Sequence, residues 1–312
     1  MPVAVYPGAA LTGARVRDLV TSSQAQFEAS ASIHERFKTP VVMSAMDLSA
    51  EAEAFGARIN LPENEIPTVV GSLVTSPGEA RDLSVPSPGD KRTGVYLETV
   101  ERLAKLPSRP LVLGSSIGPF SLAARLVGMT EAFTLTAGDP EWLHVVLEKA
   151  ASFLASYAKA YKARGAGGVL MAEPAAGLLS PRSMSLFSSA YIKRVVEAVE
   201  GQGFRVVLHN CAARPVHLGP VLESGATTIH FGPPMDIPAA LARVPAGVTV
   251  CGNLDPTKVF FQSRPEEVSR ETRKLLAATK DFDGFVISSG CDVPPGSPIA
   301  NLQAFFETAA QG

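Results

Sequence analysis

The chain has 312 residues, of which 46% are hydrophobic and 19% are charged, and its formal net charge is −2. This is an ordinary composition for a globular protein; it has no basic excess that would suit nucleic acid, and no apolar run reaches the ~18–20 residues of a membrane span. The first residues lack the pattern of a secretion signal, and three cysteines do not make a disulfide scaffold. We therefore expect a cytoplasmic protein that neither crosses a membrane nor binds nucleic acid.

Short apolar runs, most of them ending in Gly, Asn, Ser or Pro, are predicted as β-strands. They cover residues 39–47, 109–116, 167–174, 203–211, 226–232, 247–253 and 283–290, and residues 67–73 are a candidate for one more. Between the later strands, helical periodicity covers residues 139–165, 189–203, 217–225 and 265–281. Residues 72–94 are rich in Pro, Gly and Ser and are predicted as a long surface excursion, with residues 87–94 as a candidate lid.

The alternation of strands and helices predicts βα units and a parallel sheet. The strands are almost continuously apolar, as strands covered on both faces should be. An open doubly wound sheet is the alternative, but the GxGxxG segment that would favour it is not found. We therefore predict an α/β fold, a single (β/α)₈ TIM barrel over residues 1–312 with an N-terminal helical segment.

In such a barrel the chemistry takes place at the carboxyl ends of the strands. The polar residues at or just past these ends are Asp47, Ser115, Ser116, Glu173, His209, Cys211, His230, Asn253, Asp255, Ser288, Ser289, Cys291 and Asp292. His209 and Cys211 share one face because they are two residues apart on a strand, and Cys291 follows the last strand.

A His and two Cys at one barrel mouth suit Zn²⁺, and three protein ligands leave one coordination position open. The alternative is that Cys211 and Cys291 are small buried residues of the core. Cys251 lies within a strand and is predicted as a core residue. The remaining histidines are predicted to be surface, packing or structural residues: His34, His144 and His217.

Six segments of the chain resemble the uroporphyrinogen decarboxylase superfamily and, within it, the zinc-dependent, corrinoid-linked methyltransferases. They are AEAFGARI (52–59), IGPFSLAARLVG (117–128), EPAAGLLSPRSMSLF (173–187), HNC (209–211), GNLDP (252–256) and SGCDVPPGSPIANLQAFFET (289–308). The resemblance implies a (β/α)₈ barrel and Zn²⁺ bound by His209, Cys211 and Cys291. It also implies methyl transfer between a small thiol or methyl ether and the cobalt of a corrinoid. Because no D-x-H-x-x-G segment is found, the corrinoid is expected on a separate partner protein.

The chain departs from two parts of this family. The decarboxylases have an Arg-rich N-terminal segment, whereas only Arg15 and Arg17 are found here. A decarboxylase, or a non-catalytic corrinoid- or metal-binding relative, is kept as the alternative. Gly232 stands where the coenzyme M methyltransferases have an acidic residue, which puts coenzyme M in doubt as the co-substrate.

Three further residues are predicted to take part in catalysis. His230 faces the same way as Gly232 and is predicted to take over part of the missing role, as a ligand, a hydrogen-bond partner or a proton donor. Glu173 is the other candidate for a fourth ligand, and Asp47 is a candidate for the substrate pocket. Arg182 and Arg214 are the arginines nearest to the mouth but not at strand ends, which favours a neutral or phenolic substrate, as in O-demethylation.

Overall fold

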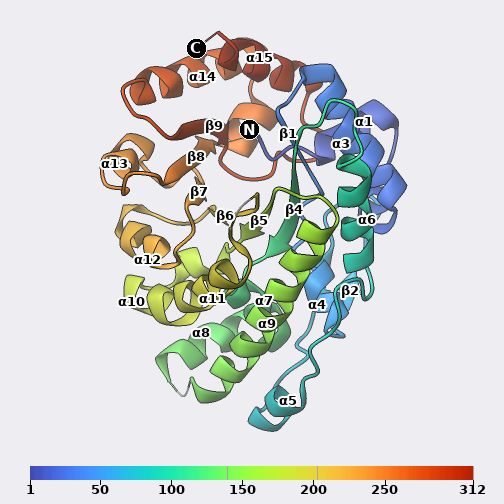
Figure 1. Ribbon diagram of the computed structural model, residues 1–312, viewed down its shortest axis with the longest axis vertical. Coiled ribbons are helices and arrows are strands. Elements are labelled where there is room, and N and C mark those ends of the chain that lie inside the picture. The colour runs from blue at the N-terminus through green and yellow to red at the C-terminus, as the bar shows by residue number, and fades with distance from the viewer. Residues whose placement is uncertain (139, 202, 312) are drawn as a thin grey trace.

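Seven parallel strands form a curled sheet with helices packed around it in the computed structural model, which describes residues 1–138, 140–201 and 203–311 (Figure 1). The hydrogen-bonded order is β1-β4-β5-β6-β7-β8-β9. These strands are β1 (Val41–Met43), β4 (Leu111–Ile117), β5 (Gly168–Ala172), β6 (Arg205–Asn210), β7 (Thr228–Phe231), β8 (Thr249–Leu254) and β9 (Phe285–Ser289). The predicted α/β barrel fold is confirmed, and each of the seven strands lies within one of the predicted runs or overlaps it.

Residues 67–73 do not supply a barrel strand, so that part of the prediction is wrong. β3 (Thr68–Val70) instead pairs antiparallel with β2 (Arg58–Asn60) in a separate two-stranded sheet. The side chains of both strands are exposed or half-buried. Apolar content alone had suggested a core strand, whereas a barrel strand would be covered on both faces.

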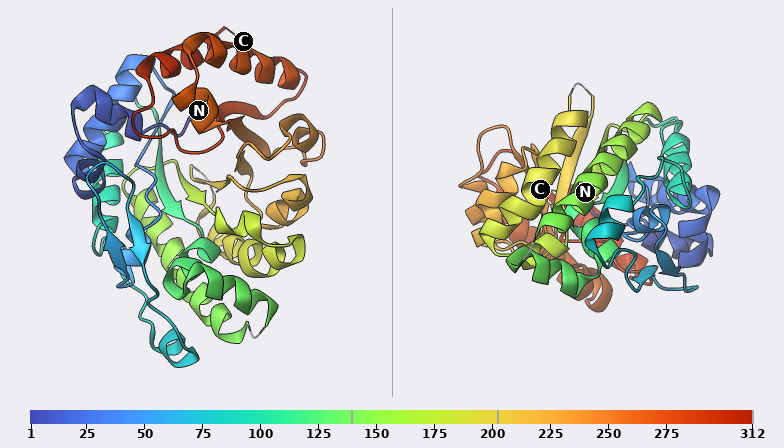
Figure 2. Two further views of the ribbon diagram at one scale, coloured as in Figure 1. Left: turned by 180° about the vertical axis from the view of Figure 1, so that it is seen from behind. Right: turned by 90° about the horizontal axis from the view of Figure 1, so that it is seen from below.

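The helices surround the sheet, and the views from behind and from below show the same arrangement (Figure 2). They are α1 (Ala9–Thr12), α2 (Val16–Thr21), α3 (Ser23–Phe37), α4 (Ala50–Ala54), α5 (Pro77–Asp82), α6 (Thr93–Leu103), α7 (Pro119–Val127), α8 (Met129–Ala137), α9 (Glu141–Ala163), α10 (Pro181–Met184), α11 (Ala190–Val199), α12 (Leu218–Glu223), α13 (Ile237–Leu241), α14 (Pro265–Thr279) and α15 (Ile299–Ala309). The four predicted helices correspond to α9, α11, α12 and α14, except that Asp139 and Gln202 lie outside the described residues. No helix in these ranges is both long enough and apolar enough to cross a membrane.

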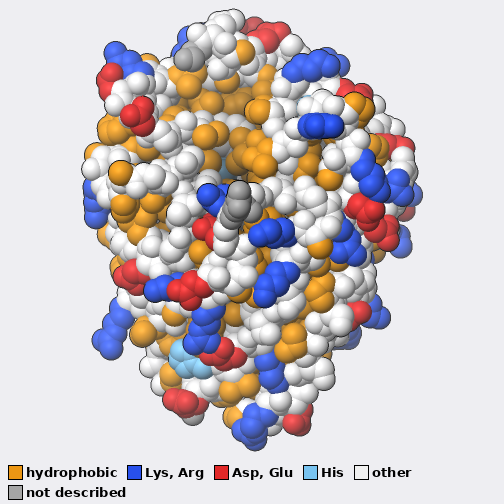
Figure 3. Space-filling view, in the orientation of Figure 1, with side chains coloured by type: hydrophobic (Ala, Val, Ile, Leu, Met, Phe, Trp, Pro, Cys, Tyr) orange, Lys and Arg blue, Asp and Glu red, His pale blue; other side chains and the backbone are white. Residues whose placement is uncertain are grey.

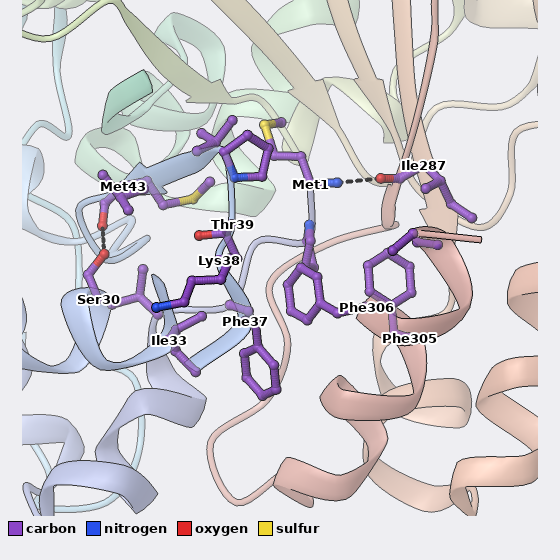
Figure 4. Close-up of a pocket in the computed structure, with 18 residues that line it drawn as sticks. Met1, Ser30, Ile33, Phe37, Lys38, Thr39, Met43, Ile287, Phe305 and Phe306 are labelled. Atoms are coloured by element: carbon purple, nitrogen blue, oxygen red, sulfur yellow. Dashed lines mark hydrogen bonds between the residues drawn. The ribbon is translucent and has the colours of Figure 1, made fainter. Parts of the chain in front are cut away.

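The N-terminal residues run beside β9, at one edge of the seven-stranded sheet. Val3 forms a parallel bridge with Asp292, and the Val293 N–H donates to the Val3 carbonyl at 2.7 Å. A cavity of about 290 Å³ lies between this segment, β1, β9, α3 and α15 (Figure 4). Hydrophobic side chains gather around a hollow in the upper part of the face in Figure 3. None of the predicted site residues lines the cavity.

The surface excursion at residues 72–94 carries α5 and extends away from the barrel (Figure 1). Several contacts hold it to the rest of the protein, beginning with the N–H groups of Leu73 and Val74, which donate to the Leu126 carbonyl at 2.7 and 3.0 Å. Lys149 of α9 donates to the carbonyls of Ala80, Arg81 and Leu83 at 2.5–2.8 Å. Arg92, near its end, is buried and pairs with Asp47. The candidate lid at residues 87–94 is therefore anchored through Arg92.

Glu51, on α4 after β1, is a buried carboxyl whose ionisation opposes folding. One of its oxygens accepts the Ile117 N–H at 3.0 Å, and the other has no hydrogen-bond partner among the described residues. Burial raises the pKa of Glu51 to about 8 from an ordinary value of 4.5. The stabilisation from the protonated form is complete below pH 4.5 and is lost as the pH rises toward 8.

We expect Glu51→Gln to make the protein more stable than wild type at pH 8 by about 2–4 kcal/mol, with little difference at pH 4.5. Urea unfolding at the two pH values measures this, with the exposed Glu101→Gln as the matched control. An equal effect of Glu51→Gln at both pH values would contradict the raised pKa of Glu51.

Candidate metal centre

The carboxyl ends of β6 and β9 bring together one histidine and two cysteines. His209 lies in β6, Cys211 directly follows that strand, and Cys291 follows β9. One potential ligand atom from each of the three lies within 4.8 Å of the others. Ligand atoms around a tetrahedral zinc are roughly 3.5–3.8 Å apart, so small side-chain movements would complete such a geometry. β6 and β9 are not neighbours in the sheet, and the curvature of the barrel is what brings their ends together.

The state of the three side chains fits a soft metal ion. His209 is 1% exposed, and its Nε2 has no hydrogen-bond partner among the described residues. An orphaned buried nitrogen is costly unless something binds it. The Cys211 sulfur is hydrogen-bonded to Cys291, which lowers the pKa of Cys211. The same contact, together with burial, raises the pKa of Cys291 to about 12.

His230 holds the imidazole of His209 from behind. The two Nδ1 atoms are 2.8 Å apart, and His230 Nε2 lies 2.8 Å from Ser288 Oγ. These residues are neighbours because β6 and β7 pair His209 with His230. Burial, and then the nearby His209, lower the pKa of His230 well below 6.5, so its ring is neutral. If His209 Nδ1–H donates to His230, the Nε2 of His209 is left with a free lone pair, which is the state a metal requires.

Gly232, which was predicted to take the place of an acidic residue, lies against the backbone of Cys211. A Cβ atom at residue 232 would be 2.1 Å from the Cys211 carbonyl oxygen and 2.6 Å from its Cα. No side chain, acidic or otherwise, fits there without moving the cysteine. A glycine at this position therefore lets the segment after β7 approach Cys211 closely.

Glu173 is not part of the three-residue set, although its backbone N–H donates to the His209 carbonyl at 2.8 Å. Its carboxylate accepts the N–H groups of Phe120 and Ser121, at 3.1 and 2.6 Å, in the first turn of α7. Burial raises the pKa of Glu173 to about 7. A Cβ on Gly118 would lie 2.3 Å from this carboxylate, so a glycine is needed there. Glu173 thus joins β5 to α7 and is not among the clustered ligands.

Asp47 is fully engaged by neighbouring side chains. Its carboxylate pairs with Arg92 and accepts from Tyr96 Oη at 2.8 Å and from Ser49 Oγ at 2.6 Å. Arg92 also pairs with Glu53 at 2.6 Å. Sequence reasoning did not find Arg92 and Tyr96, because they lie 45 and 49 residues from Asp47 and carry no local motif.

Asp292, which directly follows Cys291, is another acidic residue predicted at the barrel mouth, besides Asp47 and Glu173. Neither carboxylate oxygen has a hydrogen-bond partner among the described residues, although both are buried. Burial, and then the adjacent Cys291, raise its pKa well above 3.8. It was one of the residues predicted at strand ends, but nothing in the sequence distinguished it from the others.

The remaining cysteine and histidines lie outside the set. Cys251 is buried in β8, and burial raises its pKa to about 11, as for a thiol in the core. His34 bonds to the Thr39 carbonyl, His144 to the Tyr191 hydroxyl and His217 to the Leu179 carbonyl. These contacts hold loops and helices together.

Comparison with known proteins matches nearly the whole chain. A model of the uroporphyrinogen decarboxylase (URO-D) family matches residues 5–312. The methylcobamide:CoM methyltransferase MtbA of Methanosarcina acetivorans is 30% identical over 84% of this chain and 77% of its own length. The uroporphyrinogen decarboxylase of Pseudoalteromonas atlantica is 27% identical over 88% and 81%. The solved structure of a methyltransferase from Methanosarcina mazei superposes with a TM-score of 0.90 at 20% identity, covering 99% of this chain and 91% of that one.

Proposed function

Because the chain belongs to the uroporphyrinogen decarboxylase family, and because it carries a His-Cys-Cys set at its barrel mouth, we propose that it is a zinc-dependent methyltransferase. It would move a methyl group between a small thiol or methyl ether and the cobalt of a corrinoid carried on a partner protein. The observation that carries the proposal is the buried Nε2 of His209, which has no hydrogen-bond partner in the described part of the chain and lies next to two thiols. Relatives named as methylcobamide:CoM methyltransferases support the corrinoid.

In this proposal Zn²⁺ is held by His209 Nε2 and the sulfurs of Cys211 and Cys291. Three protein ligands leave a position open for the substrate atom. When bound, the ion would lower the pKa of a thiol or polarise an ether oxygen. The chain contributes orientation, since His230 fixes the ring of His209 and Gly232 lets β7 approach Cys211 closely. Both cysteines are half-buried, whereas Cys251 is buried.

The lack of an arginine at a strand end favours a neutral substrate such as a phenyl methyl ether. Gly232 leaves no room for the acidic residue expected in the coenzyme M enzymes, which argues against coenzyme M as the co-substrate. Asp47 and Glu173 are proposed to shape the site by holding Arg92 and α7 in place. We further propose that residues 1–312 form one domain, and that the free thiols operate in the reducing cytoplasm, in one-carbon metabolism.

Two measurements on the purified protein test the proposal. We expect about one zinc per chain by elemental analysis. Methylcobalamin should be demethylated when a thiol such as coenzyme M is added, or Co(I) corrinoid should be methylated by a phenyl methyl ether. The first result places the enzyme at the acceptor step and the second at the donor step. Absence of zinc from protein purified without chelators would overturn the proposal.

His230→Ala is expected to weaken zinc binding by about 10–100-fold, because residues that orient a metal-binding histidine have effects of this size. Competition with a zinc chelator measures the affinity. His230→Gln, which can still accept from His209, should recover part of the loss, and His144→Gln is the control at a histidine outside the site. Unchanged affinity in His230→Ala would show that the contact does not orient His209.

A further inference from the structure

The cavity between β1 and β9 lies where hydrogen bonds do not close the barrel. Within the described residues, these two strands are the ends of the sheet order and do not pair with each other. The cavity measures about 290 Å³, which is close to the lower limit of the ~300–1,000 Å³ typical of small-molecule pockets. None of the three candidate metal ligands lines it. We call this space the seam cavity.

The walls of the seam cavity are largely apolar. Phe37, at the end of α3, stacks on Phe306 of α15, with the ring centroids 4.8 Å apart (Figure 4). Ile33, Ile287 and Phe305 line the same space from α3, β9 and α15. An apolar group that enters this space is removed from water together with these walls, which favours binding. A ligand of the seam cavity should therefore have an apolar body.

Three polar residues line the seam cavity, and only one of them has a side chain that is free to bind a ligand. Ser30 Oγ donates to the Met43 carbonyl at 2.9 Å. The carbonyl and the hydroxyl of Thr39 lie 2.8 and 3.4 Å from His34 Nδ1. The half-buried Lys38 forms no ion pair within the described residues. Its ammonium group therefore has donors available for an anion.

The backbone of Lys38 is in the left-handed conformation, with a φ of 52°. Lys38 follows the last residue of α3, and its N–H donates to the His34 carbonyl at 2.7 Å. Glycine or asparagine usually ends a helix in this way, because a Cβ atom is unfavourable at positive φ. A lysine here costs stability, and residues in such conformations are common where a side chain contacts a ligand. The conformation places the side chain of Lys38 on the wall of the seam cavity.

A polar groove of about 570 Å³ adjoins the seam cavity at Lys38. Lys38, Thr39 and Pro40 line both spaces. The opposite wall of the groove is the segment before β4, and His34 Nε2 joins the two walls because it lies 2.7 Å from Ser108 Oγ. Lys38 thus stands at the boundary between an apolar space and a polar one.

The charges at this boundary favour an anion. Lys38 and the exposed Arg109 line the groove, together with one carboxylate, that of Glu35 on α3. Within the described residues, none of these three side chains forms an ion pair. The amino group of Met1 also lines the cavity, but it donates to the Ile287 carbonyl. An anionic group beside Lys38 would therefore meet two free cations and one carboxylate.

We propose that the seam cavity binds a small apolar carboxylic acid, such as a fatty acid of medium chain length. The hydrocarbon chain would lie among Ile33, Phe37 and Phe305, and the carboxylate would accept from Lys38 Nζ at the edge of the groove. Ligand pockets combine apolar walls with a few placed polar groups in this way. A lysine that donates to a carboxylate forms a charge-assisted hydrogen bond. This site shares no residue with the metal centre, and the proposal goes beyond the proposed function.

Calorimetric titration of the full chain with octanoate tests the proposal, with octanol as a neutral ligand of the same chain length. Octanoate should bind the wild type about tenfold more tightly than octanol, because only the carboxylate can pair with Lys38. Lys38→Gln should weaken octanoate binding about tenfold and leave octanol binding unchanged, whereas Lys38→Arg should retain most of the octanoate affinity. Lys91→Gln is the matched control, since Lys91 also has a positive φ, of 51°, but does not line the cavity.

Ala309→Phe tests the apolar part of the site, because Ala309 lines the cavity from α15 and a larger side chain would fill the space. It should weaken both ligands by more than about tenfold. Urea unfolding of each variant shows whether it is folded under the conditions of the titration. Absence of saturable octanoate binding to the wild type up to about 1 mM overturns the proposal. So does octanoate affinity that is no higher than that of octanol, or that is unchanged in both Lys38→Gln and Ala309→Phe.

Discussion

Replacement of Cys291 by alanine is expected to remove zinc from the protein and to lower methyl transfer by more than about 100-fold. The variant leaves only His209 and Cys211 as ligands. Two protein ligands bind zinc too weakly to retain it when the protein is diluted during purification. The zinc content, measured by elemental analysis after gel filtration, should fall from about one zinc per chain to a trace amount. The loss should be larger than in His230→Ala, because Cys291 offers a ligand atom and His230 acts through His209.

Cys251→Ala is the matched control for this experiment. It also removes one thiol from the barrel, but Cys251 is buried in β8 and lies outside the set of three. Its variant should keep its zinc and its activity and should lose only some stability. Zinc retained in Cys291→Ala, or lost equally in both variants, would show that the three-residue set is not the metal centre.

Replacement of Arg92 by methionine is expected to destabilise the protein by about 3–5 kcal/mol, because it leaves the buried Asp47 carboxylate without its cation. The Arg92 side chain is 9% exposed and that of Asp47 is 0% exposed, so water cannot take the place of the guanidinium. Arg92 also holds the excursion at residues 72–94 against the barrel, so proteolysis within this segment should become faster. Urea unfolding and limited proteolysis measure the two effects.

The exposed pair of Arg15 and Asp18 is the control, since Arg15→Met should cost less than about 1 kcal/mol. The double variant Arg92→Met/Asp47→Asn should recover part of the stability, because the uncompensated charge is gone. A cost below about 1 kcal/mol for Arg92→Met alone would contradict the role of Arg92 as the cation that stabilises buried Asp47.

The barrel was predictable from the sequence because it depends on local patterns, whereas for the His-Cys-Cys set these patterns left buried core cysteines as the alternative and the family resemblance implied the three ligands. Apolar runs at regular spacing define buried parallel strands, and such strands all end at one mouth. His209 and Cys211 share a strand, so their common face follows from the two-residue period alone. Cys291 follows another strand end. The same local reasoning misplaced residues 67–73, because an apolar run does not show which sheet it joins.

The contacts that make the site specific were decided by the tertiary structure. Arg92, at the start of α6, pairs with Asp47, which lies 45 residues earlier in the chain. His230 contacts His209 only because β6 and β7 pair in that register. Gly232 is required by a close approach to the Cys211 backbone that no spacing rule contains. Sequence patterns repeat over two to four residues, and so they determine which side chains share a face. Strand register, barrel curvature and helix docking arise between distant segments, and they determine which of those side chains touch.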